Sequence, residues 1–315
     1  MTTTMALPAV RALIPSLTNA WRKGQHGRIG IVGGSVEYTG APFYAGMASL
    51  KTGADLCHIF CAEEAAIPIK CYSPELIVHP LLRSDAALER YSAEERENAI
   101  HRAVARITDV LGRVDTLVMG PGLGRDSAVF AVVRKLICHA HISNTPLILD
   151  GDALYLVSTD PEIVRGNRNA ILTPNAMEYA RICVAVGLLR ELNVAQATLI
   201  APSAVSQALQ GPIVVRKGIA DVISDGTTSI TQDASGCPRR CGGQGDVLTG
   251  TIATFASWAS SSSTVSDEWS PLLLAAFGGS LLTRSSAHDA FERHGRSMTA
   301  PDIIQGLGTA FVQTF

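Results

Sequence analysis

The sequence has few aromatic residues and almost no surplus of charge. Phe, Trp and Tyr make up 5% of the 315 residues, too few for the aromatic platforms that stack on single-stranded nucleic acid. Lys and Arg total 26 against 28 Asp and Glu, so the formal net charge of -2 gives no basic footprint for a nucleic acid. We therefore expect no nucleic-acid partner. A local basic site for a phosphorylated small molecule stays open.

Long apolar runs are also missing. No stretch of about 20 apolar residues is free of charge, so we expect no transmembrane helix and no membrane partner. The N-terminal extension, residues 1–22, belongs to a 36-residue segment without any acidic residue, as in mitochondrial targeting peptides. The alternative is a short helix from Ala6 to Leu17 that packs on the domain and precedes a loop. We expect a cytoplasmic protein, with a mitochondrial location as the alternative.

Cysteine usage argues against a disulfide framework. The seven cysteines are odd in number and follow no signal peptide, which favours reduced thiols. Cys57 and Cys61, like Cys237 and Cys241, are separated by three residues, a spacing that zinc sites allow. Apolar residues surround the first pair and glycines the second. We therefore expect buried or incidental thiols instead of a zinc site.

What the sequence does have is apolar content, 47% of residues, arranged as short runs that alternate with helical patterns. Short continuous apolar runs are typical of strands buried on both faces of a parallel sheet. Such alternation predicts an α/β fold, a doubly wound and mostly parallel central sheet flanked by helices, in one domain covering residues 1–315. The predicted strands are Arg28–Val32, Leu56–Phe60, Thr116–Met119, Pro146–Leu149, Ala170–Leu172 and Ile213–Val215.

Helical spacing of apolar residues fills the intervals between these strands and most of the C-terminal third. A serine-rich stretch, Ser257–Ser266, is expected to be a loop. The predicted helices are Pro42–Thr52, Ala93–Leu111, Ala128–Ala140, Met177–Val186, Ser203–Gln210, Val247–Trp258, Pro271–His294 and Met298–Phe315. Turn residues follow nearly every predicted strand. In a doubly wound sheet ligands bind at that carboxyl edge, so these turns are candidate site segments.

The strongest candidate is the run Gly242-Gly243-Gln244-Gly245-Asp246, which opens the helix predicted from Val247. Glycines let a backbone approach a ligand closely, and the first amides of a helix are unpaired and favour an anion. Asp246 at this position could accept a proton from a substrate hydroxyl. An N-cap aspartate after a flexible turn is the structural alternative, but a cap does not require three glycines. The run is not a Walker loop, because Gly-Lys-Ser/Thr is missing.

Other turns add groups suited to phosphates. Lys217-Gly218 follows the sixth strand, and the guanidinium groups of Arg239 and Arg240 directly precede the glycine run. Gly120-Pro121-Gly122-Leu123-Gly124 is a second glycine turn, but it does not match the Gly-x-Gly-x-x-Gly dinucleotide fingerprint. Asn175 and Glu178 have the spacing of a capping box, which explains that pair structurally but not its place at the same sheet edge.

Read together, nine ordered blocks resemble the ATP-dependent NAD(P)H-hydrate dehydratase family of the ribokinase-like superfamily, from about Lys23 to Phe315. The blocks are 23–28, 33–35, 38–42, 73–76, 120–125, 150–152, 173–175, 217–218 and 242–246. The resemblance implies ATP-dependent dehydration of the 6-hydrated S epimers of NADH and NADPH, with ADP and phosphate as the other products. It also implies Mg²⁺ on the phosphates, although the sequence does not identify the metal ligands.

The family pattern also implies roles for individual residues. Asp246 would be the catalytic base. The hydrate pocket would contain Gly122, Asn175, Ala176, Met177, Glu178, Tyr179, Ala180, Arg181 and Asp246. The nucleotide pocket would contain Lys217, Gly218, Ile219, Ala220, Asp221, Gly236, Cys237, Pro238, Arg239, Arg240, Cys241, Gly242, Gly243, Gln244 and Gly245.

Many family members carry a fused epimerase domain, and the chain has no room for one. The resemblance therefore implies a separate NAD(P)H-hydrate epimerase as partner, and a homo-oligomer is expected by analogy. Blocks 23–28 and 38–42 look like the eukaryotic branch, which favours ATP over ADP. Three alternatives remain: a ribokinase-like kinase for a vitamin precursor such as hydroxyethylthiazole, a non-enzymatic nucleotide-binding module, and an NAD-dependent oxidoreductase.

Overall fold

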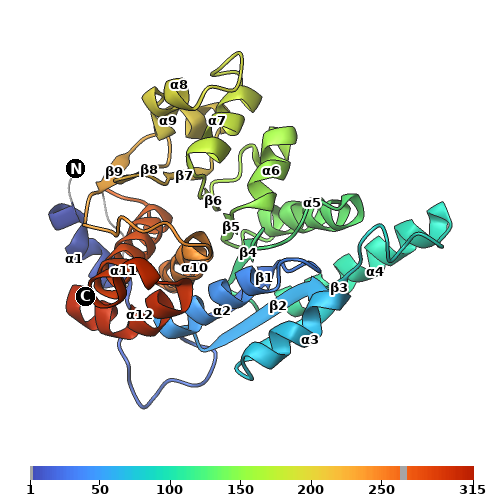
Figure 1. The fold of residues 1–315 in the computed structure, drawn as a ribbon, viewed down its shortest axis with the longest axis horizontal. Coiled ribbons are helices and arrows are strands. Elements are labelled where there is room, and N and C mark those ends of the chain that lie inside the picture. Colours follow the sequence, from blue (N-terminus) through green and yellow to red (C-terminus); the bar gives the residue numbers. More distant parts are fainter. Residues whose placement is uncertain (1–2, 263–267) are drawn as a thin grey trace.

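A single sheet runs through the protein in a computed structural model that describes residues 3–262 and 268–315 (Figure 1). Its strand order is β3-β2-β1-β4-β5-β6-β7-β8-β9. The pairings from β3 to β7 are parallel, and β8 and β9 extend that edge as antiparallel strands. The predicted fold class, a mostly parallel sheet flanked by helices, is confirmed.

The strands include the six that the sequence predicts and three that it does not. The strand β3 was missed because it lies at the sheet edge and contains Pro80, which a central strand would not accommodate. The short strands β8 and β9 carry polar residues and give no long apolar run. The bounds are β1 Arg28–Val32, β2 Leu56–Ala62, β3 Leu76–Leu82, β4 Thr116–Met119, β5 Leu147–Leu149, β6 Ala170–Leu172, β7 Ile213–Arg216, β8 Asp221–Ser224 and β9 Ser229–Gln232.

The helices match the predicted periodicity closely at two places, where α4 and α11 begin and end at the expected residues. The helices α3, α6 and α8 were not predicted. The bounds are α1 Thr3–Leu13, α2 Gly40–Thr52, α3 Glu63–Tyr72, α4 Ala93–Leu111, α5 Ser127–Ile142, α6 Asp152–Thr159, η1 Pro161–Val164, α7 Ala176–Ala185, α8 Val194–Leu199, α9 Pro202–Leu209, α10 Gln244–Ser261, α11 Pro271–His294, η2 Gly295–Ser297 and α12 Ala300–Thr314.

Helices cover both faces of the sheet (Figure 1), and a hydrophobic layer lies between the sheet and the helices on each face. One layer contains buried residues of α1, α2, α3, α10, α11 and α12, and the other contains residues of α4 to α9. The first helix belongs to the former layer, because Ala6, Val10 and Leu13 are buried and α1 contacts α11. The N-terminal extension therefore contains a short helix that packs on the sheet layer, and this helix ends earlier than the predicted Leu17.

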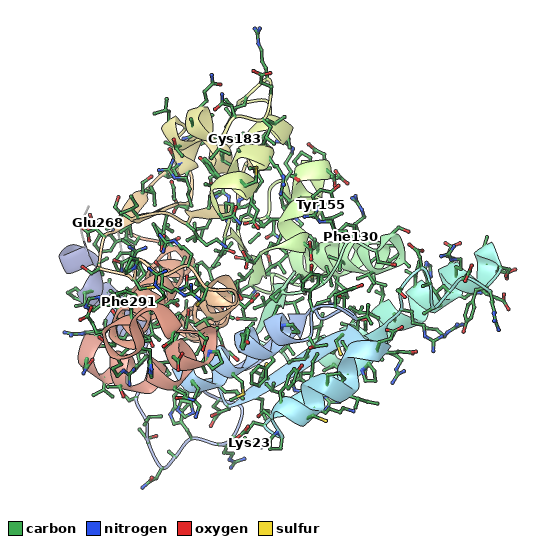
Figure 2. The ribbon with its side chains drawn as sticks, in the orientation of Figure 1. Lys23, Phe130, Tyr155, Cys183, Glu268 and Phe291 are labelled. Carbon is green, nitrogen blue, oxygen red and sulfur yellow. The ribbon has the colours of Figure 1, made fainter. Side chains whose placement is uncertain are left out.

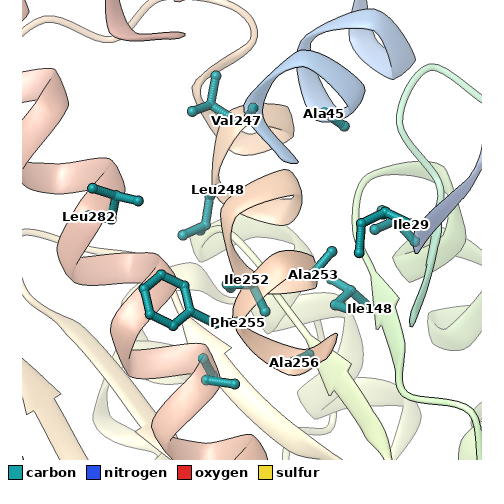
Figure 3. Packing of buried hydrophobic residues seen from close by; sticks show 14 of the residues in the cluster. Ile29, Ala45, Ile148, Val247, Leu248, Ile252, Ala253, Phe255, Ala256 and Leu282 are labelled. Atoms are coloured by element: carbon teal, nitrogen blue, oxygen red, sulfur yellow. The ribbon is translucent and has the colours of Figure 1, made fainter. Parts of the chain in front are cut away.

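Helix α10 forms the centre of the first layer. Val247, Leu248, Ile252 and Phe255 point from α10 into the core (Figure 3). Small residues let it approach α2 closely: a Cβ added to Gly250 would lie 2.1 Å from the carbonyl oxygen of Ala45. This packing fixes the start of α10 at the carboxyl edge of the sheet.

The serine-rich stretch is only partly a loop. Residues up to Ser261 continue α10, because Ser260 and Ser261 donate their hydroxyls to carbonyl oxygens one turn earlier in the helix. The expectation of a loop is therefore wrong for residues 257–261. Residues 263–267 lie outside the part of the chain that the structure describes.

Candidate active site

A cleft of about 1050 Å³ opens at the carboxyl ends of β5, β6 and β7, beside the start of α10. It is lined by segments that are far apart in the sequence. The lining residues are Asp150, Asn175, Ala176, Glu178, Lys217, Gly218, Ile219, Asp221, Asp233, Ala234, Ser235, Gly236, Cys237, Pro238, Arg240, Cys241, Gln244, Gly245, Asp246, Leu248, Thr283, Arg284 and Ala287.

The floor of the cleft is an ion pair between Lys217 and Asp150. Lys217 Nζ donates to Asp150 Oδ1 at 2.8 Å, and Thr173 Oγ1 donates to the same oxygen at 2.8 Å. The Asp150 side chain is 8% exposed and that of Lys217 is 21% exposed. Neighbouring parallel strands end at the same edge, so β5, β6 and β7 bring these groups together. Lys217 is thereby held with its ammonium group inside the cleft.

Burial alone would lower the pKa of Lys217, but three carboxylates outweigh it. Asp150, Glu178 and Asp246 favour the charged ammonium, so the pKa of Lys217 is raised. Lys217 is therefore a permanent positive charge in this cleft at neutral pH. A fixed cation in a partly desolvated cleft is suited to phosphate oxygens.

Asp246 lies in the first turn of α10 and faces this pair. Burial, together with the negative charge of Asp150, raises the pKa of its carboxyl group to about 7, against the opposing effect of Lys217. A carboxyl group with a pKa near neutrality is suited to proton transfer, because it can both accept and release a proton at working pH. The side chain of Asp246 can therefore exchange a proton with a group bound in the cleft.

The start of α10 supplies unpaired backbone donors beside Asp246. Gly243 is the N-cap residue with φ 94°, and its position has no side-chain cap. Within residues 3–262 and 268–315, the amides of Gln244, Gly245 and Asp246 meet no acceptor. A Cβ built on Gly245 would lie 3.4 Å from Lys217 Nζ and 3.2 Å from Asp150 Oδ2. The unpaired amides, the positive end of the helix dipole and the Lys217 ammonium group therefore lie together on the cleft wall, beside the Asp150 carboxylate.

The structural alternative for Asp246, an N-cap, is wrong because the helix begins earlier than expected. Gln244 is its first residue and Gly243 is the cap, so Asp246 is the third residue inside the helix. Its carboxylate is not spent on capping the chain.

The predicted capping box at α7 is confirmed. The Asn175 side chain accepts from the amides of Met177 and Glu178, and Glu178 Oε2 accepts from the Asn175 amide at 2.8 Å. Burial raises the pKa of Glu178, Lys217 lowers it and Asp150 raises it again, with the shift remaining upward. The box therefore presents a carboxyl group to the cleft while it starts the helix.

Fifteen of the predicted site residues line this cleft, and nine do not. The buried positions have a clear reason: successive residues of a helix face in different directions, so Tyr179 and Ala180 lie in the core at 0% exposure. The Tyr179 hydroxyl donates to the carbonyl oxygen of Ile200. A family stretch that is contiguous in sequence is thus not contiguous in the cleft. The residues outside the lining are Gly122, Met177, Tyr179, Ala180, Arg181, Ala220, Arg239, Gly242 and Gly243.

Gly122 belongs to a turn that packs against the first strand-end loop. A Cβ on Gly122 would lie 2.6 Å from the carbonyl oxygen of Tyr38, and the Gly34 amide donates to the Pro121 carbonyl at 3.0 Å. These contacts bring the turns after β1 and β4 together at the point where the strand order reverses.

The same turn is anchored on its other side by Asp152. The Gly124 amide donates to Asp152 Oδ2 at 2.9 Å, and Arg125 Nε donates to Oδ1 at 3.2 Å. The Arg125 guanidinium lies 4.1 Å above the ring of Tyr155, which in turn faces Phe130 (Figure 2). The turn is therefore fixed by hydrogen bonds and stacking beside the cleft.

Sequence reasoning missed eight lining residues, of which Asp150 and Arg284 are charged and have defined partners. Asp150 was visible as part of the Asp-Gly-Asp turn after a predicted strand, but it had no assigned role. Arg284 stands in a helix otherwise rich in Ala, Gly and Leu up to that point. A lone guanidinium in such a helix was the available signal. The others are Asp233, Ala234, Ser235, Leu248, Thr283 and Ala287.

The cysteines differ in how deeply they are buried. Cys57 and Cys61 are buried, and burial raises the pKa of each thiol to about 12. Cys237 is also buried, whereas Cys71 and Cys138 are exposed. Buried thiols of raised pKa stay protonated at neutral pH, so the first pair behaves as small apolar side chains.

Across the described residues no helix is long and apolar enough to cross a bilayer.

The fold and the cleft define an α/β protein in which a carboxyl group of raised pKa, a largely buried cation and unpaired helix amides meet at the carboxyl edge of a parallel sheet, an arrangement suited to phosphate-bearing ligands. A ribokinase-like superfamily protein from Enterococcus faecalis has the same fold, with a TM-score of 0.72, 21% identity, and coverage of 97% of this chain and 94% of its own.

The chain belongs to the NAD(P)H-hydrate dehydratase family, whose model matches residues 29–308. The ATP-dependent (S)-NAD(P)H-hydrate dehydratase of Physcomitrium patens is 42% identical over 96% of this chain and 94% of its own length. The ADP/ATP-dependent NAD(P)H-hydrate dehydratase from Bacillus subtilis, co-crystallized with ATP/Mg²⁺, has a TM-score of 0.68 and 20% identity. It covers 98% of this chain and 97% of its own.

Proposed function

We propose that this enzyme converts the 6-hydrated S epimers of NADH and NADPH back to NADH and NADPH, and consumes ATP. The observation that carries the proposal is Asp246, a carboxyl group of pKa about 7 beside the unpaired amides that begin α10. Membership of the dehydratase family and relatives named ATP-dependent (S)-NAD(P)H-hydrate dehydratase support the substrate and the ATP.

In the first step Asp246 accepts the proton of the 6-hydroxyl group. The hydroxyl oxygen then forms a bond to the γ-phosphorus of ATP, and the bond from that phosphorus to the bridging oxygen of ADP breaks. Negative charge on the transferred group meets the amides of Gln244 and Gly245 and the ammonium group of Lys217. Positioning and electrostatic stabilisation of this kind account for most of the catalysis of phosphoryl transfer.

In the second step the phosphorylated hydrate eliminates phosphate. The C6–O bond breaks and its electron pair leaves with phosphate, while a proton leaves C5 for water and its electron pair forms the C5=C6 double bond. Asp246 returns its proton to solvent before the next turnover. Hydroxide is a poor leaving group and phosphate a good one, which explains why a dehydration consumes ATP. The enzyme phosphorylates its substrate in order to expel the oxygen.

The donor set of the cleft fits Mg²⁺. Asp150 and Glu178 offer carboxylate oxygens in the lining, and among the described residues no group of three or more acidic, His or Cys side chains lies close enough together to hold a metal without the substrate. Mg²⁺ usually binds through one or two carboxylates together with the phosphates of its substrate. When bound, Mg²⁺ would neutralise charge on the phosphate oxygens.

Gly122, the residues from Asn175 to Glu178 and Arg181 are proposed to bind the hydrate, while Tyr179 and Ala180 lie in the core behind them. The segments 217–221 and 236–245 are proposed to bind ATP. Asn175, Glu178 and most of the nucleotide set line the same cleft, which supports this division. We further propose that a separate epimerase supplies the S epimer, that the protein acts in the cytoplasm, and that it self-associates.

The direct test is to incubate the protein with hydrated NADH, ATP and Mg²⁺ and to follow the returning absorbance of reduced nicotinamide. We expect one ADP and one phosphate for each NADH restored, and slower recovery with ADP as the phosphoryl donor. A phosphorylated product that accumulates without restored NADH would support a ribokinase-like kinase instead. Nucleotide binding without any turnover would support a binding module.

A further inference from the structure

Arg284 of α11 reaches the wall of the cleft from a helix that contains none of the predicted site residues. Its side chain is 15% exposed and lines the cleft beside Thr283 and Ala287. A guanidinium carries five donors in a rigid plane, so a mostly buried Arg is expected to have several acceptors.

The acceptors of Arg284 belong to two separate segments. In the turn after β7, Nη2 donates to the carbonyl oxygen of Ile219, and Nη1 donates to that of Gly218 at 3.4 Å and to Asp221 Oδ1 at 3.3 Å. In the segment after β9, Ala234 accepts from Nε at 2.9 Å. One side chain therefore joins both segments to α11.

Arg284 holds the middle of the turn 217–221, because it donates to the carbonyl oxygens of Gly218 and Ile219 while other groups hold the two ends. At the first end, the Lys217 amide donates to the Pro174 carbonyl at 3.0 Å. Asp221 Oδ1 accepts from the Gly218 amide at 3.0 Å and closes the turn, while Asp221 Oδ2 accepts from Ser280 of α11 at 2.7 Å. Ile219 is 92% exposed at the cleft rim and contributes no burial to hold the turn. Polar bonds to α11 thus fix the shape of a turn that carries Lys217 at its start.

The segment after β9 approaches the guanidinium closely as well. A Cβ built on Gly236 would lie 3.5 Å from Arg284 Nη2, and residues 234–236 all line the cleft. Arg284 therefore holds the turn 217–221 and the segment 234–236 in place relative to each other. Without Arg284 a bound nucleotide would have to order both segments, and the entropy lost in this ordering would weaken its binding.

We propose that Arg284 is a positioning residue that joins the turn 217–221 to the segment 234–236 and so sets the affinity of the cleft for ATP. The inference rests on the proposed function in taking ATP as the nucleotide of these segments. Arg284 acts through the backbone of both segments. Its substitution therefore weakens ATP binding much more than it slows the chemistry at Asp246.

The test compares Arg284→Met and Arg284→Lys with Arg293→Met, which removes an Arg from the same helix outside the cleft lining. Binding of a non-hydrolysable ATP analogue is measured by calorimetry, together with Tm and the separate kcat and KM values for ATP and hydrate. Arg284→Met is expected to raise the Kd for the analogue and the KM for ATP tenfold or more. The KM for hydrate and kcat at saturating ATP should stay within about twofold.

Arg284→Lys should give an intermediate Kd, because an ammonium group retains the charge but cannot span both segments. Arg293→Met should bind the analogue like the wild type. Analogue binding by Arg284→Met with wild-type affinity would overturn the inference. So would a lower Tm accompanied by changes of similar size in kcat and in the KM values for both ATP and hydrate, because that result would indicate a general loss of structure. A wild type that binds the analogue but never restores NADH would refute only the proposed dehydration.

Discussion

Two glycine-rich turns look alike in the sequence and do opposite work in the structure. The turn Gly120–Gly124 is closed: a Cβ on Gly120 would lie 1.8 Å from the carbonyl oxygen of Asp150, and Leu123 is 1% exposed. The turn Gly242–Gly245 is open on its cleft side: a Cβ on Gly242 would meet nothing within 4 Å, and one on Gly245 would face Lys217 Nζ and Asp150 Oδ2. Only Gly243 between them is packed, since its Cβ would lie 2.7 Å from Tyr44 Cδ2.

The comparison separates two uses of glycine. In the closed turn glycine permits backbone to lie against backbone, which holds the strand ends and Asp150 in place. In the open turn it leaves amides and space for a ligand beside Asp246. Glycine content at a sheet edge therefore predicts a site region, but only the neighbours decide which turn carries the chemistry.

The largest effect is expected for Gly120→Ala, which tests the closed turn. A methyl group at φ 119° would collide with the Asp150 carbonyl, so we expect destabilisation by about 3 kcal/mol or more, measured by urea unfolding. Gly242→Ala is the matched control and should change stability by less than about 0.5 kcal/mol. Equal stability of the two variants would end the distinction between the turns.

Next in size is Asp246→Asn, which tests the open turn by steady-state kinetics. Loss of the base should lower kcat by about 10²-fold or more, in line with general-base losses. Folding raises the pKa of Asp246, so the ionised carboxylate costs stability above pH 7. The variant should therefore have an equal or higher Tm at pH 8. Near wild-type turnover would remove Asp246 from its role.

Gly245→Ala should have a smaller effect on activity and almost none on stability. Its methyl group would point at Lys217 Nζ and Asp150 Oδ2 from 3.4 and 3.2 Å and enter the space proposed for the transferred phosphoryl group. We expect kcat/KM for ATP to fall about tenfold, equivalent to about 1.4 kcal/mol, with an unchanged unfolding midpoint. A lower unfolding midpoint with unchanged kinetics would contradict this prediction, because it would show that Gly245, like Gly120, is needed for packing.

The smallest expected effect is a shift in the pH profile. Asp246 must be ionised to act as a base, so kcat/KM should rise through pH 7 and fall about tenfold per unit below it. Asp150→Asn removes a neighbouring negative charge and frees Lys217, and both changes lower the pKa of Asp246. The acidic limb of the normalised profile should move to lower pH. An unmoved limb would show that Asp150 and Asp246 are not electrostatically coupled.

Most of the fold could be predicted from the sequence because the pattern of apolar residues differs between its strands and its helices. The six buried strands are short continuous apolar runs, whereas the helices α4 and α11 carry their apolar residues over segments much longer than a strand. The strands β8 and β9 could not be predicted, since these four-residue segments owe their conformation to antiparallel pairing, of β8 with β7 and of β9 with β8. For the site, the strand-end rule pointed to Lys217 and the Gly-Asp run, and Lys217, Gly245 and Asp246 line the cleft. It could not reveal Arg284, whose partners lie about 50 to 66 residues away in the chain.

The central claim is that the hydroxyl oxygen of the hydrate leaves as part of phosphate. Hydrated NADH labelled with ¹⁸O at the 6-hydroxyl group, incubated with the enzyme, ATP and Mg²⁺, tests it by mass spectrometry of the phosphate. Phosphorylation followed by C6–O cleavage predicts one ¹⁸O atom in each phosphate released. Unlabelled phosphate, with the ¹⁸O recovered in water, would contradict the account.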